Sequence, residues 1–103
     1  MSAYLIAKVN VTNMEQYQKY IAVTPGIIEK FGGRFIARGG QMVTLEGPEE
    51  THRVVLVEFP SLAQAQAFYN SADYQAAIKL RAGAATASFI IVDGVPPAPV
   101  TAP

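Results

Sequence analysis

The chain has 103 residues, eight basic and eight acidic side chains, and no cysteine. This length fits a single domain, and the lack of cysteine excludes disulfides and thiolate metal sites. Zero formal net charge without a basic run argues against a nucleic-acid partner or an acidic membrane surface. No signal peptide is evident and no apolar run approaches the roughly 20 residues of a membrane span, so we expect a cytoplasmic protein.

The first two elements are predicted at residues 3–11 and 14–30. In the strand, Leu5 and Ala7 alternate with Tyr4 and Ile6, so that both faces carry apolar side chains. Asn13 is typical of a helix N-cap, with Gln16 three residues later as in a capping box. The helix has one apolar face, formed by Met14, Tyr17, Ile21, Thr24, Ile28 and Phe31. We expect Pro25-Gly26 to kink or split this helix and Gly32-Gly33 to end it.

Residues 34–38 are predicted to form a short strand, and residues 41–46 a continuation of it. Gly39-Gly40 between them fits either a two-residue hairpin turn or a bulge in one long, bent edge strand. We favour the bulge because Gly47-Pro48-Glu49-Glu50 is a better turn.

The second half of the chain repeats the pattern of strand, helix and strand. Residues 53–59 read as a strand that is apolar on both faces, and Ser61 is typical of an N-cap. Helical spacing follows to Tyr69, is interrupted at Asn70-Ser71, and resumes from Tyr74 to Arg81. Residues 87–93 are predicted to form the last strand, and the proline-rich residues 95–103 an extended or disordered tail.

The predicted order is βαββαβ, which indicates an α+β, ferredoxin-like domain over residues 1–94 with an antiparallel sheet. We expect both helices on one face of the sheet, and the first and third strands as central, parallel neighbours. The opposite sheet face is then apolar and uncovered. Only 16% of the residues are charged, which also indicates that association with another chain buries part of the surface. We therefore expect a homodimer joined through these sheet faces.

Several short patterns in order along the chain resemble one known family. They are Phe31-Gly32-Gly33-Arg34, Ala37-Arg38-Gly39-Gly40, Glu46-Gly47, and Glu58-Phe59-Pro60-Ser61 followed by Ala65, Phe68-Tyr69, Ser71, Tyr74 and Arg81. This set resembles the domain of unknown function 1330 family of the dimeric α/β-barrel superfamily. The resemblance covers residues 3–94 and implies a ferredoxin-like subunit that dimerises through its sheet. The wider superfamily includes cofactor-free monooxygenases, haem proteins and proteins without known activity, so the resemblance implies little chemistry.

Glu58 and Arg38 are the first candidate site residues. A buried Glu58 near the end of a central strand would have a paired charge or a raised pKa, which suits a general acid or base. We expect Arg38 to lie at the same end of the sheet, beside the helix N-termini at Asn13 and Ser61. In that position the Arg38 guanidinium could bind a ligand carboxylate through two hydrogen bonds. The alternative is a structural salt bridge between Arg38 and Glu58 or Glu46.

Tyrosines and a second arginine complete the candidate set. Tyr17 and Tyr74, with Tyr20 and Tyr69, could line a pocket between helices and sheet, although a buried tyrosine more often belongs to the core. Arg81 could bind a ligand or simply complement a helix C-terminus. His52 is the sole histidine, and no spacing of ligands predicts a metal site or a cofactor.

Two functional hypotheses remain open. In the first, the protein binds or transforms a small acidic or carbonyl-bearing molecule, without a metal, in a pocket between helices and sheet. This hypothesis predicts a cavity on the order of a few hundred Å³ with convergent polar groups. In the second, the protein is a non-catalytic dimeric module, and Arg38 and Glu58 satisfy each other.

Overall fold

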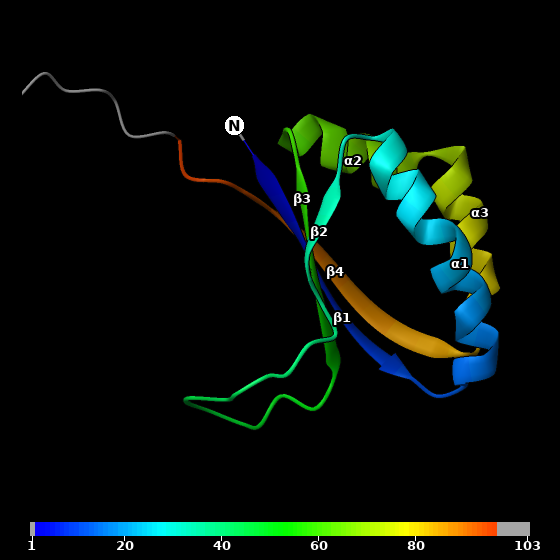
Figure 1. The fold of residues 1–103 in the computed structure, drawn as a ribbon, viewed down its shortest axis with the longest axis vertical. Helices are drawn as coiled ribbons and strands as arrows, with labels where there is room; N and C mark the ends of the chain where they lie inside the picture. Colours follow the sequence, from blue (N-terminus) through cyan, green and yellow to red (C-terminus); the bar gives the residue numbers. More distant parts are fainter. Residues whose placement is uncertain (1, 97–103) are drawn as a thin grey trace, which may run out of the picture.

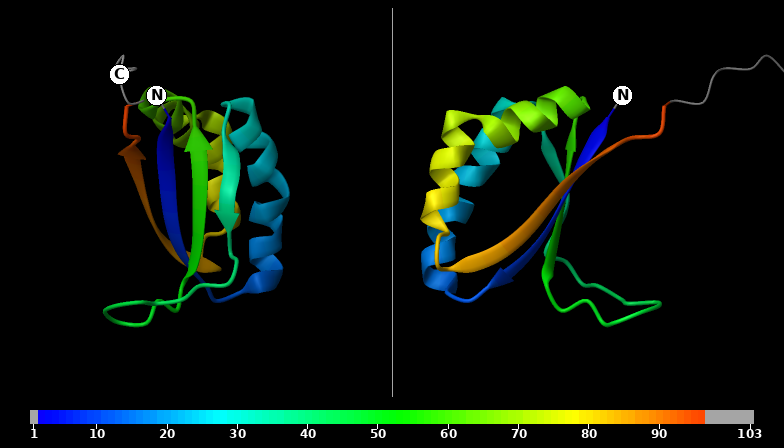
Figure 2. Two further views of the ribbon diagram at one scale, coloured as in Figure 1. Left: turned by 60° about the vertical axis from the view of Figure 1, so that its left-hand side comes forward. Right: turned by 180° about the vertical axis from the view of Figure 1, so that it is seen from behind.

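Four antiparallel strands form one sheet, and three helices cover one of its faces in the computed structural model, which describes residues 2–96 (Figure 1). The elements are β1 (Ala3–Val11), α1 (Met14–Lys30), β2 (Arg34–Arg38), β3 (Arg53–Phe59), α2 (Leu62–Asn70), α3 (Ala72–Leu80) and β4 (Ala85–Asp93). The strand order is β2-β3-β1-β4, as Figure 2 shows from the uncovered side. The predicted ferredoxin-like fold is confirmed. Residues 97–103 of the predicted tail lie outside the described residues.

The central strands β1 and β3 run antiparallel, so the expectation of parallel neighbours was wrong. Ala3 lies opposite Phe59 and Val9 opposite Arg53. The reason is the connection through α1, which carries the chain from β1 past β3 to β2. Strands β1 and β2 are therefore parallel, and β3 between them runs the other way. As a result the N-caps Asn13 and Ser61, which follow β1 and β3, lie at opposite ends of the sheet.

Helix α1 is one continuous helix of 17 residues, and Pro25 does not split it. The Asn13 side chain accepts a hydrogen bond from the Gln16 backbone N–H at 3.1 Å, which confirms the N-cap. The Gln16 side chain does not close a capping box. It donates instead to the carbonyls of Leu80 and Ala82, and so ties the start of α1 to the end of α3.

The segment 39–52 between β2 and β3 contains no regular strand, so the predicted strand at residues 41–46 was wrong. The bulge of β2 lies earlier, where the register shifts between Phe35 and Ala37. Gly39 donates to the Val54 carbonyl at 3.0 Å, and its φ of +64° then turns the chain away from β3. The segment projects from the side of the sheet that the helices leave uncovered (Figures 1 and 2).

The two faces of the sheet differ in what covers them. On the inner face, the side chains of Val57 and Phe59 are fully buried against Phe68 and Tyr74 of the helices. The other face, which we call the open face, carries mainly apolar side chains: Tyr4, Ile6, Val54, Leu56, Ile90 and Val92. No helix within residues 2–96 is long and apolar enough to cross a membrane.

Candidate functional site

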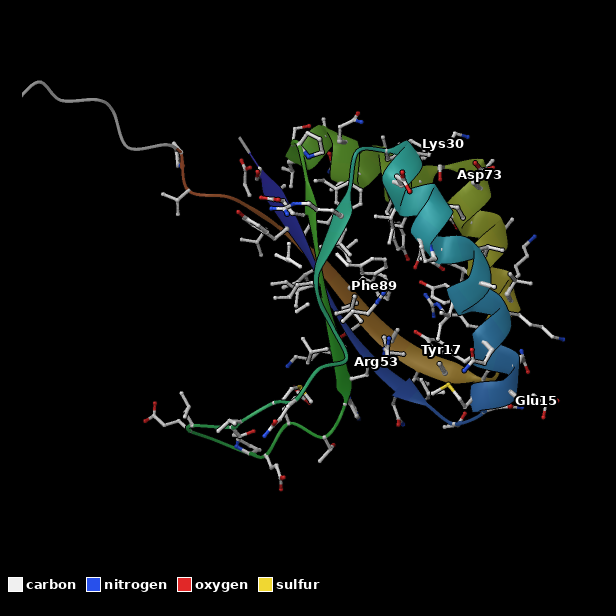
Figure 3. The ribbon with its side chains drawn as sticks, in the orientation of Figure 1. Glu15, Tyr17, Lys30, Arg53, Asp73 and Phe89 are labelled. Carbon is white, nitrogen blue, oxygen red and sulfur yellow. The ribbon has the colours of Figure 1, made fainter. Side chains whose placement is uncertain are left out.

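A cavity of about 50 Å³ lies between the inner face of the sheet and helix α1. It is smaller than the few hundred Å³ that the binding hypothesis predicted. Most of its lining is apolar, and the polar side chains that line it are Tyr17, Tyr20, Thr24, Arg38, Arg53 and Tyr74. Figure 3 shows Tyr17, Arg53 and Phe89 lying in the space between the sheet and the helices.

Strand geometry places two arginines on the inner face at the same end of the sheet. Arg53 begins β3 and lies on the same side as Val55 and Val57, because side chains alternate along a strand. Arg38 ends β2 opposite Val55, so it shares that side. Its guanidinium carbon lies 4.3 Å from the centroid of the Phe35 ring, a cation–π contact. Both side chains line the cavity.

The guanidinium of Arg53 packs against the backbone of Gly39. A Cβ atom at residue 39 would lie 2.6 Å from a terminal guanidinium nitrogen of Arg53, so any other residue here would make the guanidinium move. The Nε atom of Arg53 is buried and has no hydrogen-bond acceptor within residues 2–96. An unsatisfied buried donor is uncommon in folded proteins, and it draws attention to Arg53 as a candidate ligand-binding residue.

Tyr20, Tyr74 and Arg81 form a second polar cluster beside the two arginines. The hydroxyls of Tyr20 and Tyr74 lie 2.6 Å apart and share a hydrogen bond. The Arg81 guanidinium lies 5.3 Å from the ring centroids of both Tyr20 and Phe89, and its Nε also lacks an acceptor in the described part of the chain. Burial would lower the pKa of Arg81, but the neighbouring phenols of Tyr74 and Tyr20 raise it, so the side chain stays charged.

The cavity carries positive charge without a matching carboxylate. The ion pairs within residues 2–96 are Lys8–Glu50, Lys30–Asp73 and Arg34–Glu58, and none of these residues lines the cavity. Burial raises the pKa of Tyr17, and the neighbouring phenol of Tyr20 raises it further. The positive charges of Arg53 and Arg81 nearby oppose this rise. Neutral phenols and cationic guanidinium groups are the groups that bind an anionic oxygen. No cluster of three potential metal ligands occurs in the described residues.

Glu58 lies on the open face, away from the cavity. Its Oε1 accepts a hydrogen bond from Arg34 Nε at 2.7 Å, and Tyr4 lies 3.5 Å from Oε2. The Arg34 hydrogen bond, followed by that of Ser2, holds the pKa of Glu58 below its usual value. The alternative of a salt bridge between Arg38 and Glu58 is therefore wrong, and so is the expectation that the two residues lie at the same end of the sheet. Because β2 and β3 are antiparallel, Arg34 lies opposite Glu58 and Arg38 lies opposite Val55.

Of the predicted residues, the structure brings Tyr17, Tyr74 and Arg38 to the cavity, while Arg81 packs behind it on Tyr20. Tyr69 contacts the rings of Tyr74 and Phe89 but does not line the cavity. Sequence reasoning missed Arg53. Its signal was a charged residue two positions before Val55, on the face of the strand that packs on the helices.

These features define a ferredoxin-like subunit with a small, basic, tyrosine-bearing cavity between its sheet and its helices. The chain belongs to the family described as Domain of unknown function (DUF1330), whose profile matches residues 2–95. The predicted family is thus confirmed.

Solved structures with the same fold come from several bacteria. A protein of unknown function from Rhodopseudomonas palustris has a TM-score of 0.72 and 23% identity, covering 93% of this chain and 84% of its own. A dimeric ferredoxin-like protein of unknown function from Jannaschia sp. CCS1 has a TM-score of 0.71 and 13% identity, and the match covers 91% of this chain and 100% of that protein. SnoaB, a cofactor-independent oxygenase from Streptomyces nogalater, has a TM-score of 0.65 and 9% identity, and the match covers 95% of this chain and 97% of SnoaB. No curated protein matches the chain.

Proposed function

We propose that the protein binds a small acidic or carbonyl-bearing molecule in the cavity between α1 and the sheet. The observation that carries this proposal is the pair Arg38 and Arg53 on the inner face, where the cavity lining supplies no carboxylate to neutralise them. A guanidinium group forms paired hydrogen bonds with a carboxylate, and the hydroxyls of Tyr17 and Tyr20 could donate to a carbonyl oxygen. SnoaB, with the same fold, is described as an oxygenase, which supports a small-molecule role.

The test is a ligand screen with matched arginine variants. A panel of aliphatic and aromatic carboxylates, 2-oxo acids and their neutral amides is added to the wild type, and the melting temperature is recorded. An acid that raises the melting temperature of the wild type should have a weaker effect on Arg53→Gln and Arg38→Ala. Arg34→Gln is the control, because Arg34 pairs with Glu58 on the other side of the sheet. If no compound shifts the wild type, the non-catalytic dimeric module becomes the better hypothesis.

We further propose that two copies associate through the open face. Ile90 and Val92 are 57% and 46% exposed on this face, where they lie beside Ile6 and Tyr4 of β1 and extend its apolar surface. Residues 39–52 project from the same side, with Val43 and Leu45 73% and 90% exposed. The similar protein from Jannaschia is described as dimeric, which supports this association.

Sedimentation tests the dimer. Ile90→Glu places a charge in the open face and should convert the dimer to a monomer, because an unpaired charge in an apolar interface is costly. Val23→Glu, on the exposed side of α1, introduces the same charge away from the face and should leave the dimer intact. A wild-type protein that sediments with the 11.0 kDa mass of one chain would contradict the proposal.

A further inference from the structure

We infer that the ligand of this cavity is a short, unbranched monocarboxylic acid, held with its carboxylate against Arg53 and its hydrocarbon chain pointing toward Val57 and Phe68. This inference rests on the proposed function and deepens it by naming the class of ligand and its orientation. It depends on three features: the polarity of the two ends of the cavity, its size, and the contact between Arg53 and Gly39.

The cavity is polar and accessible at one end, and apolar and closed at the other. At the first end, Arg38 is exposed and Arg53 is half-buried. At the second end, Val57 and Phe68 are each only 1% exposed. Arg53 and Val57 lie on the same side of β3 four residues apart, which is about 13 Å along the strand. A ligand with one charged end and one apolar end fits this arrangement in a single direction.

The size of the cavity limits the length of the hydrocarbon chain. A volume of about 50 Å³ holds roughly three to five water-sized groups. If the carboxylate lies at the exposed mouth, outside this volume, three to five methylene and methyl groups correspond to an acid of about four to six carbons. Each methylene group that enters the apolar end should strengthen binding about fourfold, until the closed end is reached. A longer chain would exceed this volume and would have to displace side chains that line the cavity.

Gly39 positions the charge that binds the carboxylate. A Cβ atom at this residue would lie 2.6 Å from one terminal nitrogen and 2.9 Å from the central carbon of the Arg53 guanidinium. Gly39→Ala therefore displaces the guanidinium without removing its charge. Gly47 provides a matched control, because its φ of +81° is also positive and nothing lies within 4 Å of a Cβ atom built there. Gly39 is thus a positioning residue for the ligand.

The experiment is calorimetric titration of the wild type with straight-chain acids from acetate to octanoate and with the corresponding amides. Affinity should rise to a maximum at about four to six carbons and then fall. The amides should bind at least about tenfold more weakly, because they lose a charge-assisted hydrogen bond. The affinity of the best acid should fall about tenfold in Gly39→Ala and stay unchanged in Gly47→Ala and Arg34→Gln. Circular dichroism confirms that each variant is folded.

Each contrary result overturns a defined part of the inference. Affinity that still rises at octanoate would show that the Val57 end is not closed, and equal binding of acid and amide would remove the role of the arginine. If larger aromatic acids bind while the short acids do not, this inference fails and the proposed function stands. If no compound in either panel binds, both fail. Should Arg53→Gln unfold, Gly39→Ala still tests the arginine, since it retains the charge.

Discussion

Replacing Tyr74 by phenylalanine should destabilise the protein by leaving a buried hydroxyl without a partner. Tyr74 is 0% exposed and Tyr20 is 6% exposed, and their hydroxyls lie 2.6 Å apart. Arg81 lies near both phenols, but the contact between the two hydroxyls is the one well-formed hydrogen bond that either makes within the described residues. Tyr74→Phe therefore leaves the Tyr20 hydroxyl buried and unsatisfied, which costs about 1–3 kcal/mol of unfolding free energy. Tyr20→Phe should cost a similar amount for the same reason.

The double variant should be much less damaging than the sum of the two single variants. It removes both polar groups and keeps both rings, and replacing a hydrogen-bonded pair by apolar groups of the same shape is close to neutral. The coupling free energy from the double-mutant cycle should therefore be about 1–2 kcal/mol. If each hydroxyl contributed to stability independently of the other, the cycle would show no coupling free energy.

Urea denaturation of the wild type, both single variants and the double variant gives these free energies. The protein concentration must be the same in all four experiments, because the stability of an associating protein depends on it. Each kcal/mol corresponds to a fall of about 4–8 °C in melting temperature for a domain of this size. Tyr4→Phe is the control, since its hydroxyl lies 3.5 Å from Glu58 on the open face and should contribute little. Strictly additive single variants would refute the reasoning.

Two further predictions follow from single contacts. Gly33→Ala should destabilise the protein by about 1–3 kcal/mol, because its Cβ would lie 2.6 Å from a ring carbon of Phe59. Gly26→Ala, inside α1 with open space around it, should stabilise the protein by about 0.5–1 kcal/mol. Denaturant midpoints that move in the same direction for both variants would contradict this prediction. Because Arg34 lowers the folded-state pKa of Glu58, the stability difference between the wild type and Glu58→Gln should be fully present above pH 4.5 and disappear as the pH falls through the lowered value. A difference that persists in strong acid would show that charge is not its source.

The sequence predicted the elements of this fold better than their directions. The strands at residues 3–11 and 53–59 and the break at Ser71 are confirmed, because hydrophobic periodicity and capping residues are local signals. The direction of β3 relative to β1 depends on how α1 crosses the sheet, which is not a local property. Because of this error, Asn13 and Ser61 were predicted to lie at the same end of the sheet.

The candidate site was predicted in part, for a related physical reason. Tyr17 and Tyr74 could be found because helical spacing places them on the faces that pack on the sheet. Arg38 was found as a candidate but assigned the wrong partner, since Arg34 holds the position opposite Glu58. Arg53 was missed because a charged residue at the start of a strand is usually exposed. The segment 39–52 was assigned to a strand on composition, although a strand also needs a neighbour to pair with.

Both faces of the sheet depart from the usual pattern of a half-buried sheet, in opposite senses. Its inner face, where a core should be apolar, holds the charges of Arg38 and Arg53. The open face, where solvent should favour polar side chains, carries exposed Ile90 and Val92. Neither departure stabilises an isolated subunit, because the partial burial of the Arg53 charge and the exposure of apolar surface to water are both unfavourable. A carboxylate ligand would neutralise the first and a second copy would cover the second, so the two proposals address separate faces and can be tested separately.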